Sequence, residues 1–521
     1  MISMQENRTK IGKDVIESLT LGMYEDPRIV YREYIQNAAD QIDIAVDEGR
    51  FSNRTDGKIE IEICQSEKTI SIYDNATGVP ESKVFDTLKS IAQGIKNREK
   101  HKGFRGIGRL GGLAYCDKLI FETSYPGEST KSILTWDANK LKRIINDRNN
   151  NEEASSVIDA ITDLKIIEEE TDKRYFIVKM SNVSNKTLLN KENILNYLEM
   201  VAPVPYSKGF LFKDKIYTFA ENIGQDIDEY NIYLNHDQIF KSYTTRIYEG
   251  ENNNKKGIDE IHDLEFIEER DNNNDLIYWG WHSISNFSKQ IPKINRGRGI
   301  RLRKANIQIG MDDALVKLFK EQRGSYYFFG EIFAVDIQLI PNARRDYFIE
   351  NNKLLDFELL IKKQFIKLHD LYHFSSKVRS NKKKIEKHKE LVKNYKIKNT
   401  ESGFTSNEEK EQKLEEIDKA KDEAKKAKKQ LTNLSNKIED KDKSAEKKVF
   451  EKIVGDKETN IESFDTSDED KQTTKFITDE LTRYTRKERK LISKIFLVVD
   501  LILTPDLAEN LKQKIIEDLR G

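Results

Sequence analysis

The chain has 521 residues, and its 89 basic and 90 acidic side chains nearly cancel to a net charge of −1. That balance excludes a protein whose overall charge drives it onto nucleic acid or acidic lipid. Charged residues make up 34% of the chain, which predicts long solvated helices beside folded domains. The cysteines, Cys64 and Cys116, lack metal or redox spacing, and no apolar run has membrane-spanning length or the form of a signal peptide. We therefore expect a cytoplasmic protein of several domains with no membrane partner.

The segment Tyr31 to Asp40 has helical periodicity and carries the first functional pattern. Glu33, Asn37 and Asp40 follow one another at spacings of four and three residues, which places them on one helix face. Two carboxylates and an amide on one face could serve a hydrated magnesium ion and the phosphate that it neutralises. The alternative is the ordinary polar face of an amphipathic helix.

Two alternating segments, Ile59 to Ile63 and Thr69 to Tyr73, predict strands. The second strand leads into Asp74, whose carboxylate could accept a hydrogen bond from the amine of adenine. A plain turn of Asp, Asn and Gly is the alternative. The segment Gly103 to Gly112 then holds five glycines, whose backbone N–H groups could approach phosphate, although a mobile loop has a similar composition. It is no Walker loop, because no Lys-Ser/Thr follows the last glycine.

The order of these three motifs resembles the GHKL superfamily of gyrase-type topoisomerases, heat-shock chaperones, histidine kinases and MutL repair proteins. The resemblance implies a Bergerat-type α/β sandwich that binds ATP. By this match Glu33 would activate the attacking water, Asn37 would ligate magnesium, and Asp74 would bind the adenine amine. The family usually has glycine where this chain has Ala76. The other residues that the resemblance assigns to nucleotide binding are Asp40, Gly78 beside the base, and Gly103, Gly106 and Gly108 over the phosphates.

The rest of the ATP-binding domain continues the α/β pattern. Segments 119–123, 132–136 and 175–180 predict strands, the last closing the sheet, and 138–146 and 190–201 predict helices. The threonine of the family's last motif is not evident near 175–180. We expect this domain to span 1–210, with a glycine-rich lid at 94–112.

A second α/β domain is expected at 211–372, with strands within 232–240 and 264–282. The basic run Arg296 to Lys304 could bind nucleic acid or phosphate, and a strand with its charged face toward solvent fits equally well. A strand at 328–336 then leads into Pro341 to Asp346.

The loop after that strand resembles the catalytic loop of the middle domain of ninety-kilodalton heat-shock chaperones. In that family an asparagine is followed three residues on by an arginine that reaches the γ-phosphate, and Asn342 and Arg345 keep this spacing. Arg344 is the near alternative, and Ile349 stands where the family has a glutamine. The competing interpretation is a structural arginine pair bound to Asp346.

The C-terminal third predicts helices. The segment 377–398 is highly charged, and apolar residues from Leu414 to Ile438 recur at threes and fours, which predicts a coiled coil within 373–450. That coiled coil could be an antiparallel hairpin with 377–398 or a parallel dimer. We expect an acidic linker at 451–472 and a helical dimerisation or partner segment at 473–521, with one helix from Phe476 and another from Pro505.

The resemblance implies a magnesium-dependent ATPase that acts as a nucleotide-gated, chaperone-like homodimeric clamp. One alternative is an ATP-gated clamp on nucleic acid like MutL or the MORC proteins, held through Arg296 to Lys304. Another is a sensor ATPase that works with a separate effector protein in bacterial stress or anti-phage defence.

Overall fold

The computed structural model describes residues 11–20, 22, 24–91, 107–149, 151–250, 254–400, 404–405, 407–438, 444–455 and 476–520. The chain divides into two compact units, Met1–His369 and Asp370–Gly521. Each unit is described by itself.

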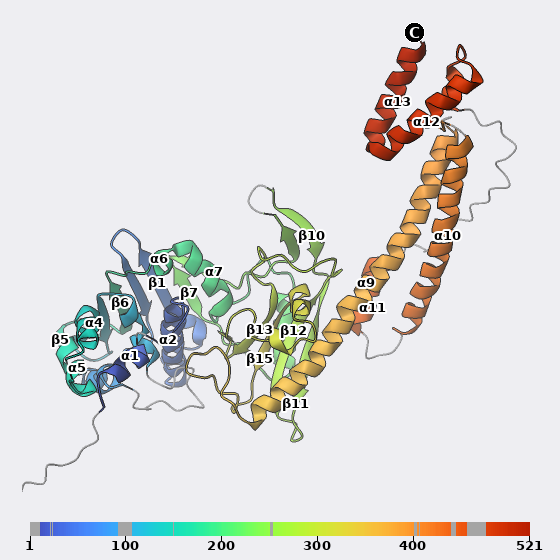
Figure 1. Ribbon diagram of the computed structural model, residues 1–521. Coiled ribbons are helices and arrows are strands. Elements are labelled where there is room, and N and C mark those ends of the chain that lie inside the picture. The colour runs from blue at the N-terminus through green and yellow to red at the C-terminus, as the bar shows by residue number, and fades with distance from the viewer. Residues whose placement is uncertain are drawn as a thin grey trace, which may run out of the picture. The chain divides into compact units, whose positions relative to one another are not determined.

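The N-terminal part of unit 1 is built on an eight-stranded sheet (Figure 1). The strand order is β5-β4-β3-β6-β2-β1-β7-β8, and every neighbouring pair is antiparallel except β1 and β7. The predicted strands and helices of this region are confirmed. The strands are β1 (Lys58–Cys64), β2 (Thr69–Asp74), β3 (Lys118–Ser124), β4 (Thr130–Asp137), β5 (Thr162–Glu168), β6 (Tyr175–Ser181), β7 (Asn231–Leu234) and β8 (Asp237–Gln238).

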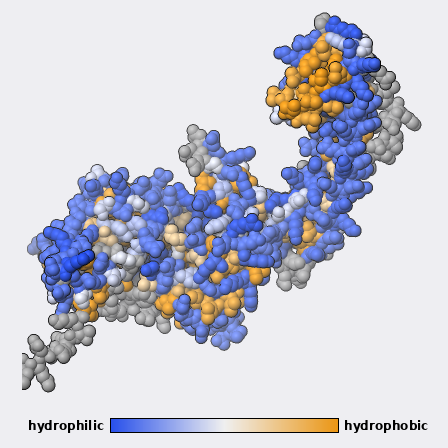
Figure 2. All heavy atoms as spheres, in the orientation of Figure 1, coloured by the Kyte–Doolittle hydropathy of each residue, from blue (hydrophilic) through white to orange (hydrophobic). Residues whose placement is uncertain are grey.

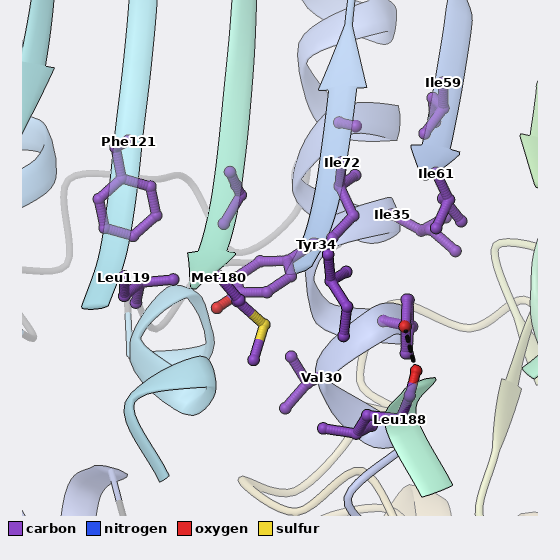
Figure 3. Close-up of a cluster of buried hydrophobic side chains, with 14 of the residues drawn as sticks. Val30, Tyr34, Ile35, Ile59, Ile61, Ile72, Leu119, Phe121, Met180 and Leu188 are labelled. Atoms are coloured by element: carbon purple, nitrogen blue, oxygen red, sulfur yellow. Dashed lines mark hydrogen bonds between the residues drawn. The ribbon is translucent and has the colours of Figure 1, made fainter. Parts of the chain in front are cut away.

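Helices cover one face of this sheet because its strands alternate between buried and more exposed positions, as in Ile59, Ile61 and Ile63 of β1. The helix α2 (Ile29–Asp47) lies on the buried face, where Tyr34 and Ile35 point toward the strands (Figure 3). The other helices of this part are α1 (Asp14–Thr20), α3 (Glu81–Val84), α4 (Ala138–Asn146), α5 (Ala154–Ile161), α6 (Lys186–Leu189) and α7 (Lys191–Val201), with short turns η1 (Arg54–Asp56), η2 (Phe85–Lys89) and η3 (Gly108–Ala114).

Two expectations about this sheet are wrong. The strand β6 does not close the sheet but lies in its middle, paired with both β3 and β2. The strands β7 and β8, expected in the second domain, extend the first sheet because β7 pairs with β1 in parallel. The division of unit 1 near residue 210 remains a prediction.

The second part of unit 1 has a five-stranded sheet of order β11-β12-β15-β13-β14. Here β13 and β15 are parallel and the other neighbours are antiparallel. Its elements are α8 (Lys213–Asn222), β11 (Asp263–Arg270), β12 (Leu276–Ile284), β13 (Gly299–Lys304), β14 (Ile307–Ile309), η5 (Val316–Leu318), η6 (Gln322–Tyr327) and β15 (Phe329–Ala334), beside the separate pair β9 (Arg246–Glu249) and β10 (Lys256–Glu260).

The basic run on β13 does not form the solvent-facing charged strand that was one expectation, because β13 lies inside the sheet. Arg303 is fully buried and pairs with the equally buried Glu331 of β15. Lys304 donates to the backbone carbonyls of Val335 and Asp336, at 2.9 and 2.7 Å. Arg303 and Lys304 are therefore used inside the protein and cannot contribute to a basic surface for nucleic acid.

Helices make up the described part of unit 2. The C-terminal half of α9 (Asn352–Thr400) packs against α10 (Asn407–Asn436), with Val392 and Tyr395 of α9 in one apolar cluster with Ile417 of α10. Figure 1 shows the two helices side by side, which supports the antiparallel hairpin rather than a parallel dimer. The alanines of the predicted seam are buried, so close helix packing explains them.

The remaining helices of unit 2 are α11 (Ser444–Val454), α12 (Arg486–Ile502) and α13 (Pro505–Arg520), with the turn η8 (Ile477–Glu480) before α12. The expected helix start at Phe476 is wrong, because Thr485 caps α12 by a capping box with Glu488. Most of the expected acidic linker at 451–472 lies outside the described residues.

Candidate functional site

A cavity enclosing about 1080 Å³ of space, partly open to solvent, lies between α2, the middle strands of the first sheet, η3 and the loop 341–345. Its walls combine carboxylates, an amide and arginines with apolar sheet residues. It is lined by Tyr24, Glu33, Tyr34, Asn37, Ala38, Gln41, Ile72, Asp74, Gly78, Val79, Thr87, Leu88, Ile107, Gly108, Arg109, Phe121, Phe176, Val178, Pro341, Asn342, Ala343 and Arg345.

Two of the predicted α2 residues, Glu33 and Asn37, line this cavity. Glu33 is only 7% exposed, so its carboxylate lies almost entirely within the protein. A buried carboxylate needs a cation or hydrogen-bond donors to compensate for its lost hydration. Asp40, on the same helix, is buried but does not line the cavity.

Gly108 directly faces Glu33. A Cβ atom at position 108 would lie 2.0 Å from Glu33 Oε2, which is far inside contact distance. Glycine at this position is therefore explained by the carboxylate, which would have to move for any other residue. Gly103 and Gly106, the other glycines assigned to the phosphates, lie outside the described residues.

Asp74 ends β2 at the floor of the cavity and is 3% exposed. Burial raises the pKa of its carboxyl to about 7, although the backbone N–H of Ala76 donates to Oδ1 at 3.1 Å and opposes the shift. A carboxylate with only one backbone donor keeps lone pairs for a ligand. The Ala76 that departs from the family pattern is fully buried beside it and is accommodated here.

Gly78 has a left-handed backbone, with φ of +67°, and it lies tightly against the sheet. A Cβ there would lie 2.0 Å from the backbone oxygen of Ser124. Because the clash is with backbone rather than with a flexible side chain, only glycine fits this turn. Val79, the next residue, donates its N–H to Thr123 Oγ1 at 2.8 Å, which fixes the turn beside the cavity.

The loop 341–345 of the second part also reaches the cavity. Arg345 Nε lies 3.0 Å from Glu33 Oε1, and both side chains are about nine-tenths buried. Asp346 accepts a hydrogen bond from Asn342 Nδ2. Arg344 is exposed, and its carbonyl oxygen accepts from Arg32 at 3.2 Å. The geometry thus selects Arg345 over Arg344, and Arg345 pairs with Glu33 rather than only with a local carboxylate.

Arg109 is a cavity residue that sequence reasoning missed. It follows Gly108, and its position at the end of the glycine-rich motif was the available signal. Burial lowers the pKa of its guanidinium to about 10, so it stays charged at neutral pH. One nitrogen donates to the Ser90 carbonyl, while its buried Nε has no hydrogen-bond partner among the described residues. Tyr24, Gln41 and Thr87 were missed as well, because their motifs carry no distinctive spacing.

The cavity lies between a helix that carries glutamate and asparagine and a mostly antiparallel sheet that carries a buried aspartate, which is the arrangement that the GHKL resemblance implies. Residues 30–171 match the family described as "Histidine kinase-, DNA gyrase B-, and HSP90-like ATPase". This region is therefore a GHKL-type ATPase domain, as the motifs predicted.

Parts of the chain are also similar to individual known proteins. The chaperone protein HtpG of Polaromonas naphthalenivorans is 26% identical over 153 residues, which cover 26% of this chain and 24% of HtpG. HtpG of Legionella pneumophila (strain Lens) is 28% identical over 158 residues, covering 26% and 25%. The chain thus spans about a quarter of the length of these relatives. The ATPase region of Saccharomyces cerevisiae topoisomerase II aligns with 65% of this chain and 85% of its own, at 14% identity and a TM-score of 0.34.

Among the residues that the structure describes, no helix is long and apolar enough to cross a membrane.

Proposed function

We propose that this chain hydrolyses ATP with magnesium and that Glu33 is the general base. The observation that carries the proposal is the position of Glu33. Its carboxylate lines the cavity, Oε1 lies 3.0 Å from Arg345 Nε, and the missing side chain of Gly108 makes room for Oε2. A general base needs a fixed position in the cavity, because it must accept a proton from a water held close to the phosphate.

The cavity residues divide into a base side and a phosphate side. Asp74 and Gly78, at the sheet, would hold adenine, with the Asp74 carboxylate accepting from its amine. Glu33, Asn37 and Arg109 lie toward the phosphate end, where Arg109 supplies a buried positive charge with an unused N–H. The buried arginine fits a phosphate group, because guanidinium groups bind phosphate oxygens in a fixed forked geometry.

The donors present also fit magnesium. Asn37 offers an amide oxygen from the half-buried face of α2, four residues after Glu33. Magnesium keeps several waters and takes few protein oxygens, so one amide beside the substrate phosphates is sufficient. When bound, the metal would neutralise charge on the phosphates, and Asn37 would hold it on the same helix face as Glu33.

Arg345 would complete the site as a cation for the transferring phosphoryl group. It comes from a loop more than three hundred residues after Glu33, so its placement requires the two parts of unit 1 to be docked. Arginines supplied in this way stabilise the charge of the transition state. This supports a clamp-like ATPase in which hydrolysis depends on the approach of the second part.

We further propose that two copies of the chain associate through α12 and α13. Figure 2 shows hydrophobic side chains gathered over these helices. Leu491, Ile495, Val498 and Ile502 are 48 to 74% exposed and follow each other at spacings of four, three and four residues. That spacing forms one stripe on α12, of the kind that packs against a second helix. The opposite side of the pair is already packed around Phe496 and Ile516.

The decisive test is hydrolysis by the purified full chain. We expect phosphate release from ATP that requires magnesium and is lost in Asp74→Asn, with ATP binding lost in parallel. Asp56→Asn, on a surface turn away from the cavity, is the matched control and should behave as wild type. ATP turnover by Asp74→Asn at the wild-type rate would contradict the assignment of this cavity.

Chaperone-like activity on an unfolded client follows from the same proposal and is measured as ATP-dependent suppression of aggregation. Stimulation of hydrolysis by DNA that fades with salt would instead favour a nucleic-acid clamp. Activation only on addition of a separate effector protein would favour a sensor ATPase in stress or anti-phage defence.

A further inference from the structure

A second cavity, widely open to solvent and with about 890 Å³ of space when its open mouth is included, lies between α7 and the segments on either side of β13 and β14. It is separate from the ATP cavity, with which it shares no lining residue. Its walls are rich in arginine. It is lined by Arg28, Asn196, Tyr197, Met200, Val201, Lys293, Asn295, Arg296, Arg298, Arg301, Gln308, Met311 and Asp312.

Two of its five cations are already paired. Arg28 Nη2 lies 2.8 Å from Asp26, and Arg296 is paired with Glu199. Those carboxylates neutralise much of their charge.

The other three cations outnumber the carboxylate that faces them. Lys293, Arg298 and Arg301 line the cavity together with one acidic residue, Asp312. Arg298 lies over the ring of Tyr326, with its guanidinium carbon 3.7 Å from the ring centroid, a contact that leaves its charge in place. The cavity therefore has an excess of positive charge.

Unused hydrogen-bonding groups lie on residues that form the wall of the same cavity. Arg301 is 7% exposed, and its other nitrogens are bound to Gln308 and to the Arg296 carbonyl, but its buried Nε has no partner among the described residues. Tyr197 is 5% exposed, and its hydroxyl also lacks a partner there. Leaving such groups unpaired is unfavourable, and a ligand that bonds to them would recover that loss.

The cavity also contains hydrogen-bond acceptors, for which a ligand would need donor groups. Asn196 Oδ1 is buried without a donor among the described residues, and Asp312 is half-buried. An inorganic anion has few hydrogen atoms to donate to these oxygens, whereas a ligand with hydroxyl groups could donate hydrogen bonds to them. The volume is also larger than a single phosphate needs, and Met200 and Val201 give it an apolar wall.

We propose that this cavity binds a small phosphorylated molecule with a hydroxyl-bearing body, of the sugar phosphate class. Arg298, Arg301 and Lys293 bind the phosphate, the Tyr197 hydroxyl donates to it, and Asn196 and Asp312 accept from the sugar hydroxyls.

The site adjoins the helix that carries Glu33. Arg28 immediately precedes α2, and its guanidinium carbon lies 4.8 Å from the centroid of the Tyr197 ring. A ligand in this cavity would therefore lie next to the residues that begin α2. Binding of that ligand does not require ATP hydrolysis.

Binding is tested by calorimetry of the full chain with ribose 5-phosphate, which has no adenine for the other cavity. An Asp74→Asn background keeps the ATP cavity out of the measurement. We expect saturable binding that weakens about tenfold in Tyr197→Phe and more in Arg298→Gln. Arg323→Gln, an exposed arginine that lines neither cavity, is the control and should bind as the parent does.

Tyr197→Phe separates ligand binding from structure. Its hydroxyl has no partner to lose, so thermal unfolding without ligand should occur at the parent temperature or above it. No binding of ribose 5-phosphate by the parent, or equal binding in all variants, would overturn the proposal. Salt-sensitive binding of an oligonucleotide, lost in Arg298→Gln while ribose 5-phosphate does not bind, would overturn it in favour of a nucleic-acid site.

Discussion

Arg345 Nε and Glu33 Oε1 lie 3.0 Å apart, although the two residues belong to different parts of unit 1. The pair joins the expected general base to the expected phosphate-binding arginine. In this arrangement the carboxylate is held by a cation rather than by water. Under the proposed function, ATP hydrolysis would require Arg345 to turn from Glu33 to the phosphate, so nucleotide binding would release the base.

Glu33→Gln should bind ATP but lose hydrolysis by about 10²- to 10⁴-fold, because the amide cannot accept the proton of the attacking water. The side chain keeps its size beside Gly108. Phosphate release and nucleotide affinity are measured on the same preparation. Wild-type turnover in this variant would show that another group is the base.

Arg345→Ala should reduce turnover by about 10³-fold or more and leave ATP affinity within a few-fold of wild type. Arg344→Ala, at the exposed neighbour, is the matched control and should retain activity. Equal losses of affinity and turnover in Arg345→Ala would mean that Arg345 holds the loop rather than the transition state. Arg345→Lys tests geometry, because lysine keeps the charge but loses the fork.

Gly108→Ala should lower turnover by about 10²-fold, since the new Cβ would displace the Glu33 carboxylate. Gly257→Ala, where nothing lies within 4 Å of the added atom and the backbone φ is not positive, controls for the loss of a glycine. The thermal unfolding temperature is measured with the turnover. A Gly108→Ala enzyme as active as wild type would show that the Glu33 position is not critical.

Asp74 should make stability depend on pH. Its folded pKa of about 7 lies above the ordinary value of 3.8, so the folded state binds a proton that the unfolded state has released. The free energy of unfolding of wild type, relative to Asp74→Asn, should therefore fall by about 1.4 kcal/mol per unit as pH rises from 4 to 7 and then level off. Urea unfolding at several pH values measures this difference, and a constant difference would contradict the raised pKa.

The same titration should appear in nucleotide binding. Adenine needs the acceptor carboxylate, so binding at pH 6 should release a proton and be weaker than at pH 8. Calorimetry of ADP binding in buffers of different ionisation enthalpy gives the number of protons released on binding. Guanosine diphosphate offers no exocyclic amine at the same ring position and should bind poorly at both pH values.

Leu501→Glu with Ile502→Glu should yield monomers, because these side chains are 85 and 74% exposed and carry the apolar surface of α12. Light scattering gives the molecular mass of each form. Lys494→Glu, a charge change on the same helix, should leave the mass unchanged. A wild-type chain that is already monomeric at micromolar concentration would rule out association through this surface.

The sequence predicted residues that the structure brings together in one cavity where chemistry and spacing coincide. Glu33 and Asn37 share a helix face, and Gly108 is required by contact with Glu33, so a local pattern was sufficient. Arg345 was predicted through its spacing from Asn342. Arg109 was missed because its role depends on burial, which no local pattern reports.

The incorrect predictions concern residues whose strand or ion-pair partners are distant in the sequence. Nothing in the residues of β7 indicates that it joins β1 rather than the second sheet, because parallel pairing depends on the path of the intervening chain. The basic run on β13 has the composition of a nucleic-acid surface. Its partner Glu331 lies on another strand, so the burial of Arg303 could not be predicted from the run itself.

The parallel pairing of β7 with β1 also determines which fragment of the protein can be produced. A fragment that ends at residue 210 would retain every proposed ATP contact except Arg345 and Asn342, yet it would lack β7 and β8. It would leave β1 as an open edge, with unpaired N–H and C=O groups beside the apolar Ile59 and Ile61. Such a fragment would be prone to pair edge to edge, whereas one extended past Gln238 would keep the sheet covered.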